Sequence, residues 1–345
     1  MFRPWRGSAN ICVLFPWLAP WAIDLSALPG SSHLTTMPSS IKRGIGTGTS
    51  LVLLLVLVGS CARTPPKIDP SVYAKEITQW QTQRLAELKS EDGWLTLVGL
   101  FWLKEGDNKL GSGPANEISL PRYKIPPDAA VFTLKNGQVE FAAPPKSGFT
   151  VEGKPATQLT LKSDDDGSPT VLHLSSLTFQ VIKRGDKLGL RVKDSQNPDR
   201  MNFPGTQFYP ADLKWRIDAQ FVPYNPPKPV SITNVLGMES GEASPGAVKF
   251  EVNGNTYQLD AITEKGETRY FMIIADKTSG KETYPAGRYL YVDPPDSSGR
   301  MLIDFNKAYS PPCAFTKFAT CPLPPRQNRL PFPIEAGEKY SGHPK

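Results

Sequence analysis

Histidine and cysteine are scarce in this sequence: its 345 residues include three histidines and four cysteines. A zinc or similar metal site needs several such ligands at matching spacing, and beyond residue 60 the histidines are His173 and His343 alone. The sequence also lacks a phosphate-binding glycine loop, a dinucleotide fingerprint and a Gly-x-Ser-x-Gly motif. We therefore expect no metal site and no cofactor.

An acidic run at Asp164-Asp165-Asp166-Gly167 resembles a calcium loop only in composition. The alternation of acidic and other residues that a calcium-binding loop requires is absent. The run therefore predicts a solvated turn.

Clusters of basic residues are missing as well, although the formal net charge is +6. Part of this charge belongs to residues 1–60, which hold Arg3, Arg6, Lys42 and Arg43 against Asp24 alone. A protein that binds a phosphate backbone concentrates its basic groups on one face. The sequence predicts no nucleic-acid partner.

Long hydrophobic runs are absent, and the longest purely aliphatic one, Leu51–Val58, has only eight residues. Such a run cannot cross an apolar bilayer core of about 30 Å. Lys42-Arg43 precede it and Gly59-Ser60 follow it, which is the pattern of a secretory signal peptide. Val58-Gly59-Ser60-Cys61 resembles the lipobox of bacterial lipoproteins, and this resemblance implies acylation of the Cys61 thiol.

These features divide the N-terminal part of the chain into three segments. Residues 1–36 are broken by prolines and read as an over-extended start, residues 37–60 as the lipoprotein signal peptide, and residues 61–70 as a proline-rich tether. We expect a protein of the cell envelope that contacts the membrane through lipidated Cys61. It would face the periplasm from the outer membrane or from the outer leaflet of the inner membrane.

The remaining composition favours a mostly-β fold. Proline, at 35 residues, has about twice its usual share, and 39% hydrophobic residues suffice for a core. A single substantial helix is predicted over residues 71–91, since Asp69 suits an N-cap, Pro70 suits the first turn and apolar residues repeat at helical spacing.

Short strands follow the helix. The uncharged run 94–103 predicts a buried strand pair or a strand broken at Gly99, and Asn136-Gly137 and Asn253-Gly254 each predict a tight hairpin. We expect a β-sandwich over residues 94–222 and a second β-rich part over residues 228–340 that ends in a proline- and cysteine-rich loop. The turn-rich stretch 223–229 is the predicted boundary.

Several motifs resemble the bacterial and archaeal family known as domain of unknown function 1684, over about residues 75–340. The motifs are Gly93-Trp94-Leu95, Val98–Leu103, Asp276–Gly280, Gly287–Leu290, Asp304-Phe305-Asn306 and Cys313 with Cys321–Pro324 and Asn328–Leu330. The resemblance implies a mostly-β, often exported protein, and it implies no particular activity.

A local resemblance concerns the start of the predicted sandwich. Gly106, Leu110-Gly111-Ser112 and Asn116–Leu120 resemble the opening of forkhead-associated β-sandwiches, which bind phosphothreonine. Ser112 stands where that family has an arginine, and its Ser-x-x-His is missing. The resemblance therefore implies a shared fold without phosphopeptide binding.

Polar residues near the C-terminus are the candidate ligand-binding set: Arg288, Tyr289, Asp304, Asn306, Asn328 and Glu338. An arginine fork could clamp a carboxylate or a phosphate, and an aspartate and asparagine at a strand end could orient a ligand. The same groups could instead satisfy the backbone of an irregular proline-rich loop. Both interpretations remain open from the sequence.

Cys313 and Cys321 have seven residues between them. In an exported protein this spacing favours a disulfide, which would add about 2–3 kcal/mol by closing so small a loop. A metal site and a catalytic thiolate are the alternatives, and both lack the histidines that would support them.

Two functions follow as hypotheses. The first is an exported, lipid-anchored binding or structural protein of the envelope, with a small polar ligand, a glycan or a partner protein. The second is an envelope hydrolase in which Asp304 and a glutamate act on substrate and Arg288 clamps it.

Overall fold

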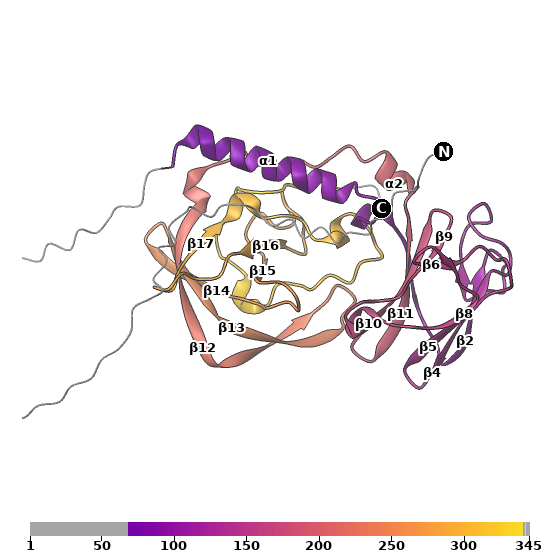
Figure 1. Ribbon diagram of the computed structural model, residues 1–345. Helices are drawn as coiled ribbons and strands as arrows, with labels where there is room; N and C mark the ends of the chain where they lie inside the picture. Colours follow the sequence, from indigo (N-terminus) through magenta and orange to yellow (C-terminus); the bar gives the residue numbers. More distant parts are fainter. Residues whose placement is uncertain (1–67, 341, 343–345) are drawn as a thin grey trace, which may run out of the picture. The chain divides into compact units, whose positions relative to one another are not determined.

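β-strands dominate the computed structural model, which describes residues 68–340 and 342 (Figure 1). The predicted start, the signal peptide, Cys61 and most of the tether lie outside these residues. The first half contains α1 (Pro70–Leu88), β1 (Leu97–Trp102), β2 (Gly106–Gly111), β3 (Ile118–Ser119), β4 (Ala130–Lys135), β5 (Gln138–Ala142), β6 (Thr150–Val151), β7 (Lys154–Pro155), β8 (Gln158–Leu161), β9 (Val171–Leu174), β10 (Leu177–Arg184) and β11 (Lys187–Asp194).

The second half follows a short helix, α2 (Pro198–Met201). Its strands are β12 (Arg216–Thr233), β13 (Glu239–Val252), β14 (Asn255–Asp260), β15 (Tyr270–Ile274), β16 (Arg288–Val292) and β17 (Arg300–Asp304). Single 3-10 turns are η1 (Trp94–Thr96), η2 (Asp164–Asp166), η3 (Leu213–Trp215), η4 (Phe305–Lys307), η5 (Pro312–Ala314) and η6 (Arg326–Asn328). The mostly-β prediction is confirmed.

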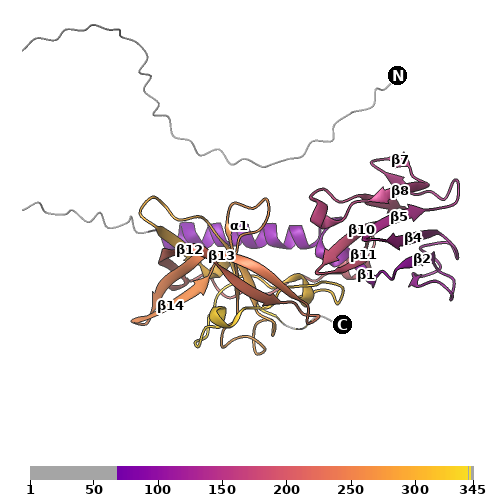
Figure 2. The ribbon, with the colours of Figure 1, turned by 90° about the horizontal axis from the view of Figure 1, so that it is seen from below.

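Helix α1 begins as the sequence predicts, because the Asp69 carboxylate accepts a hydrogen bond from the Ser71 backbone N–H and Pro70 occupies the first turn. The helix ends at Leu88, and residues 89–92 form a turn rather than a further helical turn. Its buried face carries Tyr73, Ile77 and Leu88. Figures 1 and 2 both show α1 lying along the second half of the chain.

The first half is a β-sandwich. A six-stranded sheet, β1-β11-β10-β9-β6-β7, packs on a five-stranded sheet, β3-β2-β4-β5-β8. Their inner faces share one core in which Phe132, Phe141 and Phe179 are almost fully buried. Alternation along β5, exposed Gln138 against buried Val139 and Phe141, shows how one face of each strand enters this core.

Both predicted hairpins are present. β4 and β5 pair through Asn136 and Gly137, which have φ of 51° and 76°, the left-handed backbone that a two-residue type I′ turn requires. Asn253 and Gly254 do the same between β13 and β14, with φ of 52° and 75°. The uncharged run at 94–103 forms η1 and one strand, β1, whose register shifts between Leu97 and Gly99.

The second half has its own core. A four-stranded sheet, β14-β13-β12-β17, and the β15-β16 hairpin bury a separate apolar cluster that includes Val248, Met272 and Ile303. The irregular C-terminal segment, residues 304–338, contributes Phe305, Leu330 and Ile334 to this cluster. The cysteine- and proline-rich segment is therefore held by the core.

The division between the halves differs from the predicted one. The stretch 223–229 lies inside β12, where the pairing with β13 shifts register between Pro223 and Lys228. Prolines are tolerated at such an irregularity because ladder hydrogen bonds are interrupted there. Ala219 on the early part of β12 is packed in the second core, so residues 216–222 belong to the second half.

Within the described part of the chain, none of the helices is both long enough and apolar enough to cross a membrane.

Candidate functional site

Asp304 and Asn306 lie together beneath helix α1. The Tyr73 hydroxyl donates to Asp304 Oδ1 at 2.7 Å and accepts from Asn306 Nδ2 at 2.8 Å. Asn306 also exchanges hydrogen bonds with the backbone of Asp212, through Oδ1 at 3.0 Å and Nδ2 at 2.9 Å. Burial and the hydrogen bond to Asp304 raise the pKa of Tyr73. The two predicted site residues therefore fasten α1 and the 212 turn to the end of β17.

Arg288 is fully buried at the start of β16. Its Nη2 donates to Asp276 Oδ2 at 2.7 Å and to the Ile334 carbonyl at 2.9 Å, and its Nη1 donates to the Ala336 carbonyl. The Asp276 carboxylate also accepts from the Ile334 N–H. The guanidinium therefore anchors the C-terminal segment instead of facing a cavity.

Glu338 is also fully buried. Its Oε2 lies 3.3 Å from Arg84 Nε, and Arg84 Nη2 donates to the Ser310 carbonyl at 2.9 Å. Burial raises the pKa of Glu338, and the positive charge of Arg84 opposes that rise. This pair connects α1 to both ends of the irregular segment.

Asn328 and Tyr289 complete the predicted set. The Asn328 side chain pairs with the backbone of Asp260, accepting from N–H at 2.8 Å and donating to C=O at 3.0 Å, as a neighbouring strand would. The Tyr289 hydroxyl donates to the Pro322 carbonyl at 2.9 Å. Burial raises the pKa of Tyr289.

Cys313 and Cys321 are free thiols in the structure but lie next to each other, since the Cys313 N–H donates to Cys321 Sγ at 3.0 Å. The hydrogen bond from its partner lowers the pKa of Cys313, whereas burial raises the pKa of Cys321. The disulfide stays a prediction, and the positions of the two residues suit it.

The predicted polar residues thus fall into separate contact networks. Asp304 with Asn306, Arg288 with Asp276, and Glu338 with Arg84 share no hydrogen-bond partner. The structure gives them internal partners, which matches the second interpretation that the sequence left open. Across residues 68–340, no three His, Cys, Asp or Glu side chains are grouped as a metal site requires.

A hollow of about 520 Å³ lies beside the first of these networks. Tyr73, Asp212 and Glu335 are among the residues that line it, together with Tyr209 and Lys214. Asp304 and Asn306 do not line it, because their side chains are turned toward Tyr73 and the 212 backbone.

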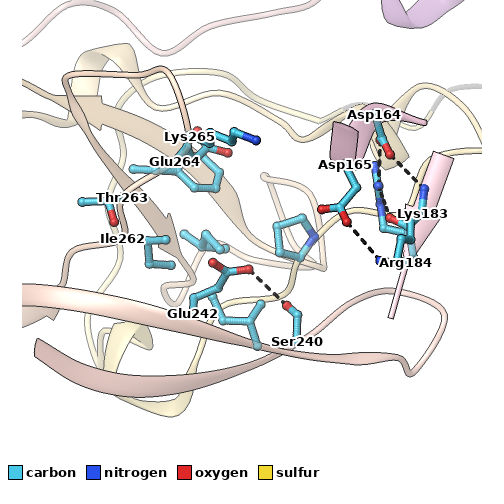
Figure 3. A pocket seen from close by; sticks show the side chains of 14 residues that line it. Asp164, Asp165, Lys183, Arg184, Ser240, Glu242, Ile262, Thr263, Glu264 and Lys265 are labelled. Atoms are coloured by element: carbon cyan, nitrogen blue, oxygen red, sulfur yellow. Dashed lines mark hydrogen bonds and ion pairs between the residues drawn. The ribbon is translucent and has the colours of Figure 1, made fainter. Parts of the chain in front are cut away.

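A second cavity, which we call the cleft, lies between the sandwich and the second half and has a volume of about 440 Å³ (Figure 3). It combines charged walls with an apolar floor. Its lining residues are Asp164, Asp165, Lys183, Arg184, Ile232, Ser240, Glu242, Ile262, Thr263, Glu264, Lys265, Phe271, Ile273 and Pro322.

One wall of the cleft belongs to the sandwich. Arg184 at the end of β10 pairs with Asp164 at 2.8 Å, and Lys183 pairs with Asp165 at 3.1 Å. Arg184 Nε also donates to Thr320 Oγ1 at 3.1 Å, which links this wall to the cysteine loop. Turn η2 is held by a capping box between Ser163 and Asp166, so its first two aspartates are free to face the two cations.

The opposite walls come from the second half. Ser240 and Glu242 lie on β13, and Ile262, Thr263, Glu264 and Lys265 lie on the loop between β14 and β15 (Figure 3). The floor is formed by Ile232, Ile262, Phe271 and Ile273, which belong to one buried cluster with Tyr289 and Cys321. Predicted site residues therefore lie under the cleft but do not line it.

Sequence reasoning missed the cleft because its lining comes from stretches far apart in the chain. The one local signal was the acidic run at 164–166, which was interpreted as a solvated turn. That turn is present as η2, and two of its carboxylates carry ion pairs with a strand of the sandwich.

Comparison with known proteins gives limited matches. A search of curated proteins finds no match. The solution NMR structure of an uncharacterized protein of Haloarcula marismortui is 29% identical over 41% of this chain and 78% of that one, with a TM-score of 0.35. A structure described as a structural and functional analysis of phosphothreonine-dependent FHA domain interactions is 19% identical over 28% of this chain and 96% of that one, with a TM-score of 0.20.

The family predicted from the sequence is found over the C-terminal part of the predicted range. Residues 201–339 match the family model described as "Protein of unknown function (DUF1684)". This region covers β12 to β17, including Arg288 on β16, and the irregular segment that carries Asp304 and the two cysteines. This match supports the family predicted from the sequence over residues 201–339.

Proposed function

We propose that this protein is a lipid-anchored protein of the cell envelope that binds a small polar ligand in the cleft. The observation that carries the proposal is the cleft itself, about 440 Å³ of space with charged walls over an apolar floor. Ligand sites in proteins are concave and combine apolar surface with a few placed polar groups. A small polar molecule or a monosaccharide-sized part of a glycan fits such a volume.

The walls of the cleft are suited to binding because they are already positioned. Arg184 is fixed by Asp164 and by Thr320, and Ser240 Oγ donates to Glu242 at 3.3 Å. Ile262 is held in place by two backbone hydrogen bonds with Phe271. Polar groups that are positioned before binding lose less conformational freedom when a ligand arrives.

The lipid anchor rests on the sequence around Cys61. Charged residues, a short apolar run and Val58-Gly59-Ser60-Cys61 have the order of a lipoprotein signal. Helix α1 begins at Pro70, so only a short tether separates it from Cys61. Acylation at Cys61 would hold the domain at a membrane surface facing the periplasm, and more than one acyl chain makes such an anchor stable.

The binding proposal is tested by a thermal-shift screen of small polar compounds and sugars on the protein and on a cleft-filling variant. Thr263 is exposed and lines the cleft, so Thr263→Trp places an indole in the ligand space. Thr256→Trp, on the exposed face of β14 and away from the cleft, is the matched control. A compound that raises the melting temperature should act on the protein and on the control, and should lose its effect on Thr263→Trp.

The screen contradicts the proposal if every stabilising compound acts equally on both tryptophan variants. The anchor is tested separately, since Cys61→Ser should abolish incorporation of labelled palmitate. Palmitate that remains on this variant would contradict lipidation at Cys61.

A further inference from the structure

The charges in the cleft do not balance one another. Its lining includes four acidic side chains, Asp164, Asp165, Glu242 and Glu264, and three basic ones, Lys183, Arg184 and Lys265. On the sandwich side each cation has its own carboxylate, Arg184 with Asp164 and Lys183 with Asp165. That wall is neutral as a whole.

The walls of the second half are different. Within the described part of the chain, the hydrogen bonds found for Glu242 and Glu264 in the cleft come from neutral hydroxyl groups. Ser240 Oγ lies 3.3 Å from Glu242, and the Tyr291 hydroxyl donates to Glu264 at 2.5 Å. Neither carboxylate belongs to any of the ion pairs among these residues, although each retains free acceptor positions.

The floor adds an apolar surface between these carboxylates and the sandwich. Ile232, Ile262, Phe271 and Ile273 are at least 95% buried and form the bottom of the cleft. A hydrocarbon group of a ligand would contact these side chains, whose other faces are packed in the core and already shielded from water. A ligand complementary to both features has a positively charged nitrogen and an apolar body.

From this charge pattern we infer that the cleft selects primary amines, with the ammonium group between Glu242 and Glu264 and a short alkyl or ring body on the isoleucine floor. The inference rests on the proposed function, since it names the chemical class of ligand for the same cleft. An ammonium group donates three hydrogen bonds and suits two carboxylates that lack a cation, because charge-assisted hydrogen bonds are the strong ones.

Lys265 provides a test of the sign of the ligand's charge. It lines the same wall as Glu264 and is exposed. If the ligand is a cation, removing this positive charge by Lys265→Gln strengthens binding or leaves it unchanged. If the ligand were an anion, the same change would weaken binding.

The experiment compares three probes of nearly equal shape: n-butylamine, n-butanol and butyrate. Each is titrated into the full-length protein, and the dissociation constant is obtained from the chemical shifts of backbone amides around Ile262 and Thr263. We expect butylamine to bind most tightly. Glu242→Gln and Glu264→Gln should each weaken butylamine by about threefold to tenfold and leave butanol unchanged.

Glu251→Gln is the matched control, because Glu251 lies on the same strand as Glu242, is exposed and does not line the cleft. Butylamine should bind this variant as it binds the original protein. Equal weakening by Glu251→Gln and Glu242→Gln would overturn the inference, because the effect would then be one of overall charge.

Different results would overturn the choice of amines as the ligand class and the proposal that the cleft binds a ligand. Butanol or butyrate binding in the cleft as tightly as butylamine overturns the amine class and leaves the cleft as a binding site. If none of the probes shifts the cleft amides, the amine inference is overturned. If the compound screen also finds no molecule sensitive to Thr263→Trp, the binding proposal falls with it.

Discussion

Charged side chains occupy two contrasting environments in this protein. Around the C-terminal segment, Arg288 of β16 and Glu338 are fully buried and directed at internal partners, which for Arg288 include two backbone carbonyls of the segment. In the cleft, Glu242 is partly exposed and Glu264 and Lys265 are exposed, and they take part in none of the ion pairs of the described residues. A buried charge must be paired, because burial without a partner is costly. A charge at the rim of a cavity is solvated in the free protein and can therefore remain unpaired until a ligand binds.

This contrast separates residues that hold the fold from residues that can recognise something. The C-terminal segment has little regular structure. Arg288 donates to its backbone carbonyls at Ile334 and Ala336, and its own Asn328 side chain pairs with the backbone of Asp260 on β14. The segment's polar side chains therefore have structural partners within the chain. In the cleft, by contrast, Glu242, Glu264 and Lys265 hold no other part of the chain through an ion pair of the described residues.

The largest expected effect is on stability, from breaking the buried Arg288–Asp276 pair. Arg288→Met leaves the Asp276 carboxylate buried without its cation, and it leaves the Ile334 and Ala336 carbonyls without a donor. We expect a loss of about 3–5 kcal/mol in the free energy of unfolding, measured by urea denaturation. Arg300→Met, at a side chain that is 74% exposed, is the control and should change stability little. Equal stability of the two variants would remove the distinction between the regions.

The cysteine pair comes next. Oxidation of Cys313 and Cys321 should stabilise the protein by about 2–3 kcal/mol, because it closes a short loop in the unfolded chain. Protein produced by export to an oxidising compartment and unfolded without reductant should show no free thiol at these positions, and reduction should lower its melting temperature. Two titratable thiols in such a preparation would contradict the disulfide.

A smaller effect is expected beneath helix α1. Tyr73→Phe removes the hydroxyl that bridges Asp304 and Asn306, and a lost buried hydrogen bond with a carboxylate costs about 1.5–3 kcal/mol. Tyr123→Phe, at a tyrosine that is 82% exposed, is the matched control. Urea denaturation should show a lower midpoint for Tyr73→Phe alone. An unchanged midpoint would mean that this network does not fasten the helix.

The smallest effect is a pH dependence from Glu338. Because burial raises the pKa of Glu338 above its ordinary value of 4.5, the folded protein holds this proton more tightly than the unfolded chain. The corresponding stability is fully present below pH 4.5 and is lost as the pH rises through the higher pKa of the folded state. Glu338→Gln should therefore gain stability relative to the original protein as the pH increases from 4.5.

The difference in unfolding free energy between the original protein and Glu338→Gln, measured from pH 4 to pH 8, checks this sign. Glu335→Gln, at an exposed neighbour, should run parallel to the original protein. If Glu338→Gln instead loses stability relative to the original protein as the pH rises, Arg84 outweighs burial at Glu338.

Much of the fold could be predicted because its signals are local. Asp69 with Pro70 marks the start of α1, and two Asn-Gly pairs mark hairpins, since few other residues adopt the required positive φ. The cleft has no such signal, because Arg184, Glu242 and Glu264 come together only through the packing of the two halves. The continuation of β12 through residues 223–229 could not be predicted, because its prolines suggest a turn and its pairing with β13 shifts register there.

The sequence singles out polar residues near the C-terminus, and in the structure these residues make contacts that hold the fold. Asp304, Arg288 and Glu338 stand out in the sequence because polar residues in an apolar context need partners. The sequence cannot say whether the partner is a ligand or the chain's own backbone. The structure supplies backbone and side-chain partners for all three.

The most direct test of the account is the location of a bound ligand. The strongest compound from the thermal-shift screen is titrated into the protein, and the perturbed backbone amides are mapped. We predict shifts at Ile262, Thr263 and Glu264 and, across the cleft, at Lys183 and Arg184. Shifts gathered instead around Tyr73 and Asp212, beside the hollow next to the Asp304 network, would contradict it.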